Sequence, residues 1–196
     1  MNMKFGLPNV GKYIMKDGRL ADDTSQKEQV LGVVFDETDE NIRFLPLFDT
    51  DCRQSYSLKE ILDIAEKYDR KHGSQYLKWA VPSLSDWNMI ISRLGKTQIR
   101  ADEQVGFNDR MDEWTEFDGS TAIENLKNLD VTPQLSYWSC SQGYDDEVYF
   151  LNLETGTIEA CPVWDDGEEY DYALRLVGCF CKKEINRQKL CDSFKA

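Results

Sequence analysis

The order of periodic segments along the sequence predicts an α+β fold. Short apolar runs with the alternation of β-strands fill residues 12–47 and return after Pro133, and amphipathic segments with helical period lie between them. A polar, weakly periodic stretch over 96–119 follows the second of these helical segments. With 196 residues, of which 41% are hydrophobic, the chain is long enough to bury a core without disulfide staples.

Residues 12–47 are predicted to form strands joined by polar turns. Asp17-Gly18 is a strong turn signal, and the β-branched run from Leu31 to Phe35 is typical of a central strand. The polar residues 36–41 provide a hairpin connection, after which a strand resumes over 42–47.

The clearest helix is predicted over 57–72. Ser57 and Glu60 form a Ser-x-x-Glu capping box, and Gly73 is suited to follow the last turn. One face of this helix is apolar and is expected to be buried; it consists of Leu58, Ile61, Leu62, Ala65 and Tyr68.

Two more helices are predicted before the late strands. The first covers about 83–94, with Ser83 or Ser85 as its cap, and its Trp87 is expected in the core. The second is shorter, over 121–129, and begins with the capping box Thr121-Ala-Ile-Glu124.

The residues after Pro133 are predicted to return to strands. A strand over 137–140 places Trp138 in the core, and segments 148–153 and 157–161 form a hairpin around a turn that contains Gly156. The last strand is predicted over 172–181. Its side chains alternate, with Ala173, Arg175 and Val177 on one face and Leu174, Leu176 and Gly178 on the other.

Residues 1–181 are predicted to form one domain, and residues 182–196 a basic tail suited to a terminal helix. The tail holds five lysines and arginines against two acidic residues, whereas the whole chain carries a net charge of −13. Two alternatives stay open for the tail: it packs on the acidic body of the protein, or it docks a partner.

The charge and the apolar runs exclude some functions. A net charge of −13 and a pI near 4.5 repel phosphate backbones, so nucleic-acid binding is not expected. The apolar runs are far shorter than the roughly 20 residues of a spanning helix, so membrane insertion is not expected. Residues 1–11 have no secretory-signal pattern, which predicts a cytoplasmic protein if the chain is full length and a cell-surface or secreted one if a leader has been removed.

Several stretches, in the same order over roughly 10–180, resemble one bacterial family. Gly32-Val-Val-Phe35 is similar to its "IGVVF" strand, residues 79–87 to its Leu-Pro-Ser helix entry, and Tyr137-Trp-Ser-Cys140 to its "YWSS" strand. The chain resembles the Lcl C-terminal-like domain family. The resemblance implies a C-type lectin-like fold with twisted antiparallel sheets, two main flanking helices and long irregular loops, distantly similar to the formylglycine-generating-enzyme family.

That resemblance also implies where a ligand binds. In such a fold the first and last strands pair, and the long loops, here about 96–119 and 141–171, present the ligand surface. The sequence departs from the family pattern at Cys140, where the family has a second serine, and at Arg175-Leu176-Val177, where the family has Arg-Pro-Val.

The residues themselves favour neither metal nor cofactor. The acidic runs 145–147 and 165–169 lack the alternating spacing of an EF-hand and are expected to form a solvated face. Cys179-x-Cys181 has no second cysteine pair at ligand spacing, and the single histidine, His72, is expected to be exposed at a helix end. Gly6 to Lys12 has the spacing of a phosphate loop, but Tyr13 stands where magnesium would need a hydroxyl.

The remaining sequence pattern, aromatic residues next to acidic residues, favours a binding function. Tyrosine and tryptophan anchor interfaces, and carboxylates at their rim steer ligands. We expect Trp114, Tyr144, Trp164 and Tyr170 to contact the ligand, with Asp112, Asp165 and Asp166 as its polar rim. The prediction is a non-catalytic, calcium-independent module that recognises a protein or a glycan.

Two alternatives to that prediction stay open. One is a cysteine-dependent enzyme of the formylglycine-generating type, using Cys179 with Cys181 or Cys140 with Cys161. The other is an acidic intracellular protein that binds a basic protein partner.

Overall fold

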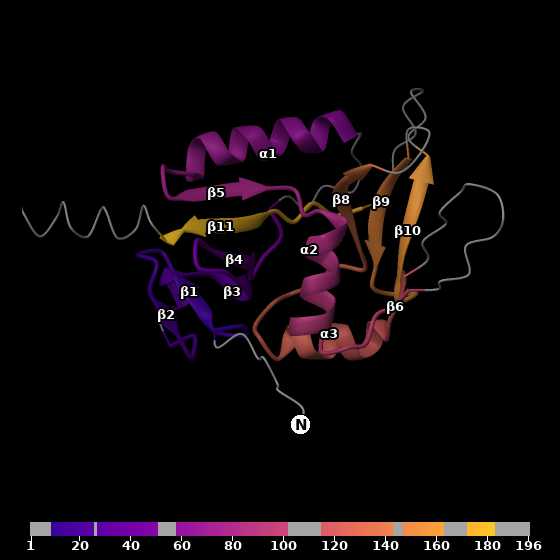
Figure 1. The fold of residues 1–196 in the computed structure, drawn as a ribbon, viewed down its shortest axis with the longest axis horizontal. Coiled ribbons are helices and arrows are strands. Elements are labelled where there is room, and N and C mark those ends of the chain that lie inside the picture. The colour runs from indigo at the N-terminus through magenta and orange to yellow at the C-terminus, as the bar shows by residue number, and fades with distance from the viewer. Residues whose placement is uncertain are drawn as a thin grey trace, which may run out of the picture.

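A computed structural model describes residues 9–25, 27–50, 58–101, 115–142, 147–162 and 172–182. These residues form two antiparallel sheets and three α-helices, which confirms the predicted α+β class (Figure 1). The helices are α1 (Leu58–His72), α2 (Leu84–Met89) and α3 (Gly119–Lys127), with a short helix η1 (Lys27–Gln29) and a π-helical turn η2 (Ile90–Leu94) that continues α2.

The first sheet joins the two ends of the described chain. Its order is β2-β1-β3-β4-β11-β5, built from β1 (Tyr13–Met15), β2 (Leu20–Ala21), β3 (Val30–Glu37), β4 (Asn41–Pro46), β5 (Leu77–Ala80) and β11 (Val177–Cys181). The last strand lies between β4 and β5, where Gly178 is opposite both Phe44 and Trp79. It does not pair with β1, the first strand, which lies beside β2 and β3.

The second sheet holds the late strands. Its order is β6-β7-β10-β9-β8, built from β6 (Arg100–Ala101), β7 (Thr115–Glu116), β8 (Ser136–Gln142), β9 (Glu147–Asn152) and β10 (Thr157–Pro162). The predicted hairpin is confirmed as β9 and β10, and Gly156 takes a φ of 73° in its turn. Only glycine adopts that conformation without steric cost.

The segment before β11 connects the two sheets. Ala173 bridges Tyr137 in parallel fashion, and the Ala173 amide donates to the Ser136 carbonyl at 2.9 Å. The strand predicted over 172–181 forms only over Val177–Cys181. As the chain crosses into the first sheet, the side chains before this strand still alternate between two cores. Ala173 and Val177 belong with one core, and Leu174 and Leu176 with the other.

Both cores are anchored by large aromatic residues. One core fills the space among the two sheets, α2, η2 and α3; the other lies on the opposite face of the first sheet, against α1. Trp87 and Trp138 are 2% and 1% exposed, which confirms their predicted core positions. The Trp87 indole N–H donates to the Trp138 carbonyl at 3.0 Å, so α2 is tied directly to β8.

Two details of α1 and α3 differ from prediction. Leu62 is 47% exposed rather than buried, because the buried face of α1 centres on Ile61 and Ala65. The α3 helix begins at Gly119 and is capped by Asp118, not by Thr121. The main-chain amide of Thr121, followed by hydroxyl donors, lowers the pKa of Asp118 to about 2.

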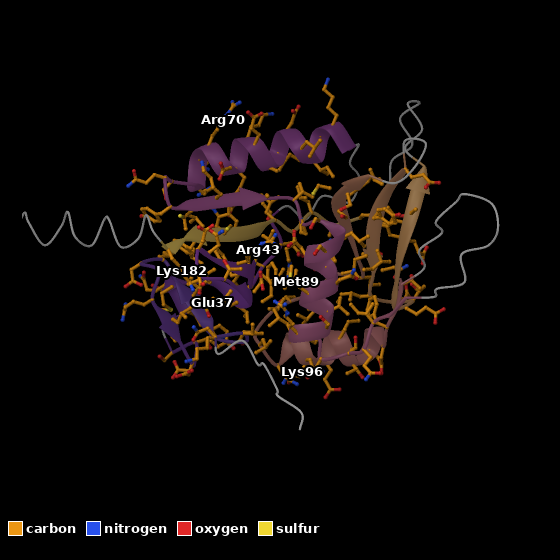
Figure 2. The ribbon with its side chains drawn as sticks, in the orientation of Figure 1. Glu37, Arg43, Arg70, Met89, Lys96 and Lys182 are labelled. Atoms are coloured by element: carbon orange, nitrogen blue, oxygen red, sulfur yellow. The ribbon has the colours of Figure 1, made fainter. Side chains whose placement is uncertain are left out.

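Local signals placed the start of α2 correctly. Ser83 caps α2 and forms a reciprocal capping box with Asp86. Lys182, the first residue of the basic tail, pairs with Glu37 of β3 at 2.5 Å, and Figure 2 shows the two side by side. Residues 183–196 lie outside the described residues, as does Ser57. No helix in the described part of the chain is long and apolar enough to cross a membrane.

Candidate functional site

The seven residues predicted to form the ligand site all lie outside the described residues. These are Trp114, Tyr144, Trp164, Tyr170, Asp112, Asp165 and Asp166. At the edge of that region Phe117, which also belongs to the predicted loops, is half-buried against the core, and its amide donates to the Gly156 carbonyl at 2.8 Å. Phe117 is therefore a core contact rather than a free loop aromatic.

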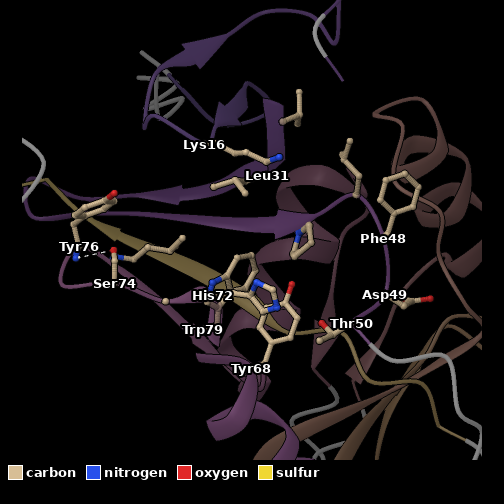
Figure 3. A pocket seen from close by; sticks show the side chains of 15 residues that line it. Lys16, Leu31, Phe48, Asp49, Thr50, Tyr68, His72, Ser74, Tyr76 and Trp79 are labelled. Atoms are coloured by element: carbon tan, nitrogen blue, oxygen red, sulfur yellow. Dashed lines mark hydrogen bonds between the residues drawn. The ribbon is translucent and has the colours of Figure 1, made fainter. Parts of the chain in front are cut away.

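A different site lies within the described residues. A groove of about 580 Å³ runs over one face of the first sheet beside α1 (Figure 3). That volume is within the range of about 300–1,000 Å³ that is usual for ligand sites. Its lining comes from β3, from the ends of β1, β4 and α1, and from β5: Lys16, Val30, Leu31, Pro46, Leu47, Phe48, Asp49, Thr50, Tyr68, His72, Gly73, Ser74, Tyr76, Leu77 and Trp79.

Aromatic rings form the side of the groove next to α1. The rings of Tyr68 and His72 are 4.4 Å apart, and Tyr68 meets Trp79 edge-on at 5.2 Å. Tyr76 lies nearly parallel to the buried ring of Phe180, at 6.0 Å and 8°. Burial raises the pKa of Tyr68, and its protonated hydroxyl is a hydrogen-bond donor in the groove. His72 is exposed at the helix end, as predicted.

The connection between α1 and β5 positions these rings. The Gly73 amide donates to the Asp69 carbonyl at 2.7 Å, which ends the helix, and the Ser74 hydroxyl accepts from the amides of Tyr76 and Leu77. The Asp69 carboxylate then accepts from the Trp79 amide at 2.8 Å. That bond also satisfies an outward-facing donor on β5, which is an edge strand.

A buried ion pair fixes the opposite end of the groove. Asp49 accepts from the Arg175 Nε at 2.6 Å and from the Tyr137 hydroxyl at 3.0 Å, and the side chains of Arg175 and Asp49 are 1% and 4% exposed. The Thr50 hydroxyl accepts from the Leu176 amide at 2.9 Å. These bonds hold the segment that carries Phe48, a side chain that is 70% exposed.

Lys16 supplies the fixed charge of the groove. Its amide donates to the Gln29 carbonyl at 2.8 Å, which sets the turn after β1, and its exposed side chain lies across the groove from Tyr68 and Trp79 in Figure 3. Among the described residues Lys16 has no ion-pair partner. Since Asp49 is neutralised by Arg175, Lys16 gives the described part of the groove an unpaired positive charge.

Two thiols of the described residues, those of Cys140 and Cys179, are poorly suited to nucleophilic chemistry. Cys140, Cys179 and Cys181 are free, and burial raises the pKa of both Cys140 and Cys179. A raised pKa leaves little thiolate, the reactive form, at neutral pH. In the part of the chain that is described, no three His, Cys, Asp or Glu side chains are grouped to hold a metal ion.

No protein-family model matches the chain, and no curated protein matches it.

The groove is not predicted by the sequence, although two of its aromatic lining residues, Tyr68 and Trp79, lie in segments with clear patterns. Tyr68 was assigned to the apolar face of α1, and Trp79 to the resemblance at 79–87, but no local pattern joins them to Lys16 or Phe48. The buried Arg175–Asp49 pair was also missed, because its two residues are 126 positions apart.

Proposed function

We propose that the chain is a non-catalytic, calcium-independent binding module that recognises a protein or glycan ligand. The observation that carries the proposal is the aromatic groove between α1 and β3, whose rings are held by packing and by backbone hydrogen bonds. Preformed rings lose little conformational entropy on binding, so they are efficient anchors.

The chemistry of the described side chains favours binding over catalysis. No cysteine is among the described residues that line the groove, and the raised pKa values of Cys140 and Cys179 weigh against a cysteine-dependent enzyme. The Ser74 hydroxyl already accepts two backbone hydrogen bonds beside His72, an arrangement that serves the turn of the chain.

Alanine variants test the proposal on immobilised peptide and glycan arrays. Tyr76→Ala removes a half-buried ring from the groove and is expected to weaken binding by about tenfold or more, as for an interface anchor. Leu62→Ala is the matched control, because it removes an exposed apolar side chain from α1 outside the groove.

A second variant tests the loop residues predicted from the sequence. Replacing Trp114, Tyr144, Trp164 and Tyr170 together by alanine removes the predicted loop contacts. Loss of binding only in this variant would assign the ligand to the loops instead of the groove. A folded chain that binds no member of either array would contradict the proposed function itself.

A further inference from the structure

The two sides of the groove differ in chemistry. The side next to α1 is aromatic, whereas the side formed by β3 and the end of β4 is aliphatic, with Val30, Leu31, Pro46 and Leu47. The four aliphatic side chains have no hydrogen-bond donor or acceptor, so an apolar group of the ligand gains most from burial against them. An apolar side chain suits both sides.

Apolar side chains are also exposed on the segments at this end of the groove. Phe48 is 70% exposed and Leu135 is 53% exposed, and both are among the most exposed large hydrophobic residues described. Their segments are neighbours, since the Thr132 amide donates to the Leu47 carbonyl at 3.1 Å. Exposed apolar side chains beside a groove favour a protein as the ligand.

The charge of the groove limits the ligand further. Lys16 is unpaired among the described residues, while Asp49 is held by Arg175, so a ligand carboxylate is favoured beside the apolar contact. The net charge of −13 repels a strongly acidic partner at long range. A ligand with one carboxylate can pair with Lys16 without strong repulsion, whereas a ligand with several acidic residues in a row would be repelled.

We propose that the groove binds a protein segment that presents an aromatic or large aliphatic side chain next to a single carboxylate. The apolar side chain lies between the aromatic and aliphatic sides, and the carboxylate pairs with Lys16. This inference rests on the proposed binding function and adds the class of ligand that the groove selects.

Three matched peptides test the inference by isothermal titration with the full chain. The probe is acetyl-Gly-Phe-Asp-Gly-amide; one control replaces its Asp by Asn, and the other replaces its Phe by Ala. The Asp peptide is expected to bind about fivefold more tightly than the Asn peptide, the size of one solvent-accessible ion pair. The Ala control is expected to bind more weakly than either, since it lacks the ring.

Charge variants locate the effect at Lys16. Lys16→Gln should abolish the preference for the Asp peptide over the Asn peptide. Lys127→Gln, an equal loss of charge on the exposed surface of α3, should leave the preference intact. Added salt should reduce the preference in the wild-type chain.

Several results would overturn the inference. Equal affinity for the Asp and Asn peptides would do so, as would a preference that survives in Lys16→Gln. Binding of a galacturonic acid trisaccharide, lost in Tyr76→Ala, with no binding of any of the three peptides, would overturn the ligand class but leave the binding function standing. The same holds if phenylacetate binds and the peptides do not.

Discussion

Replacing Asp49 by alanine is expected to destabilise the protein more than any change at an exposed ion pair. The Asp49 carboxylate accepts from the Arg175 Nε at 2.6 Å and from the Tyr137 hydroxyl at 3.0 Å. Arg175 is 1% exposed, so the variant leaves a guanidinium group in the interior without its counter-charge.

The expected cost follows from that burial. Removing one partner of a buried ion pair costs about 3–5 kcal/mol, because the remaining charge stays desolvated. The free energy of unfolding of a native protein is about 5–15 kcal/mol, so this loss is a large part of the total stability. Arg175 also donates to the Thr132 and Pro46 carbonyls, and these bonds place the expected value at the lower end of the range.

Urea unfolding followed by tryptophan fluorescence measures this cost. With a slope of about 3 kcal/mol per molar urea, the midpoint should fall by about 1 M or more. Asp17→Ala is the matched control: its carboxylate pairs with Arg19 at the surface, 53% exposed, and its loss should cost less than about 1 kcal/mol. The double variant Asp49→Leu, Arg175→Met should recover much of the stability. Equal losses of stability in Asp49→Ala and Asp17→Ala would contradict the expected cost of leaving the Arg175 charge buried without a partner.

Three other variants address single interactions. Asp118→Ala should lower stability at neutral pH, because hydrogen bonds from a backbone amide and then from hydroxyls lower the pKa of Asp118 from 3.8 to about 2. That stabilisation is present above pH 3.8 and is lost as the pH falls through about 2, so the thermal midpoints of wild type and variant should converge in acid. A constant gap between the two midpoints would argue against it. Gly178→Ala places a Cβ 2.0 Å from the enclosed Phe44 ring and should cost about 1–3 kcal/mol in urea unfolding; an unchanged midpoint would show that the ring can move. Asp69→Ala removes the acceptor of the Trp79 amide at the edge of β5, so it should cost about 1 kcal/mol of stability and increase self-association in sedimentation velocity. A monomeric variant of wild-type stability would show that this strand edge does not need the Asp69 carboxylate.

Local sequence signals predicted the elements that depend on neighbours in the chain. The Ser83 cap, the Gly156 turn and the alternation of residues 173–178 between two cores are all as expected. Each depends on backbone conformation or on a period of two, which a short window of sequence contains. The start of α3, predicted at the Thr121 capping box, is wrong because it depends on packing. The Gly119 backbone lies so close to the Leu153 carbonyl that a Cβ there would be 2.1 Å away, and Asp118 became the cap.

By itself, then, the sequence determined an α+β chain with two strand regions around capped helices and two tryptophans in its core. Only the tertiary structure decided that β11 lies between β4 and β5, that Arg175 meets Asp49, and that Lys16 faces Tyr68 across a groove. The physical reason is the range of the interactions. Caps and turns are settled within a few residues, whereas strand order, buried ion pairs and grooves depend on which distant segments bury apolar surface together.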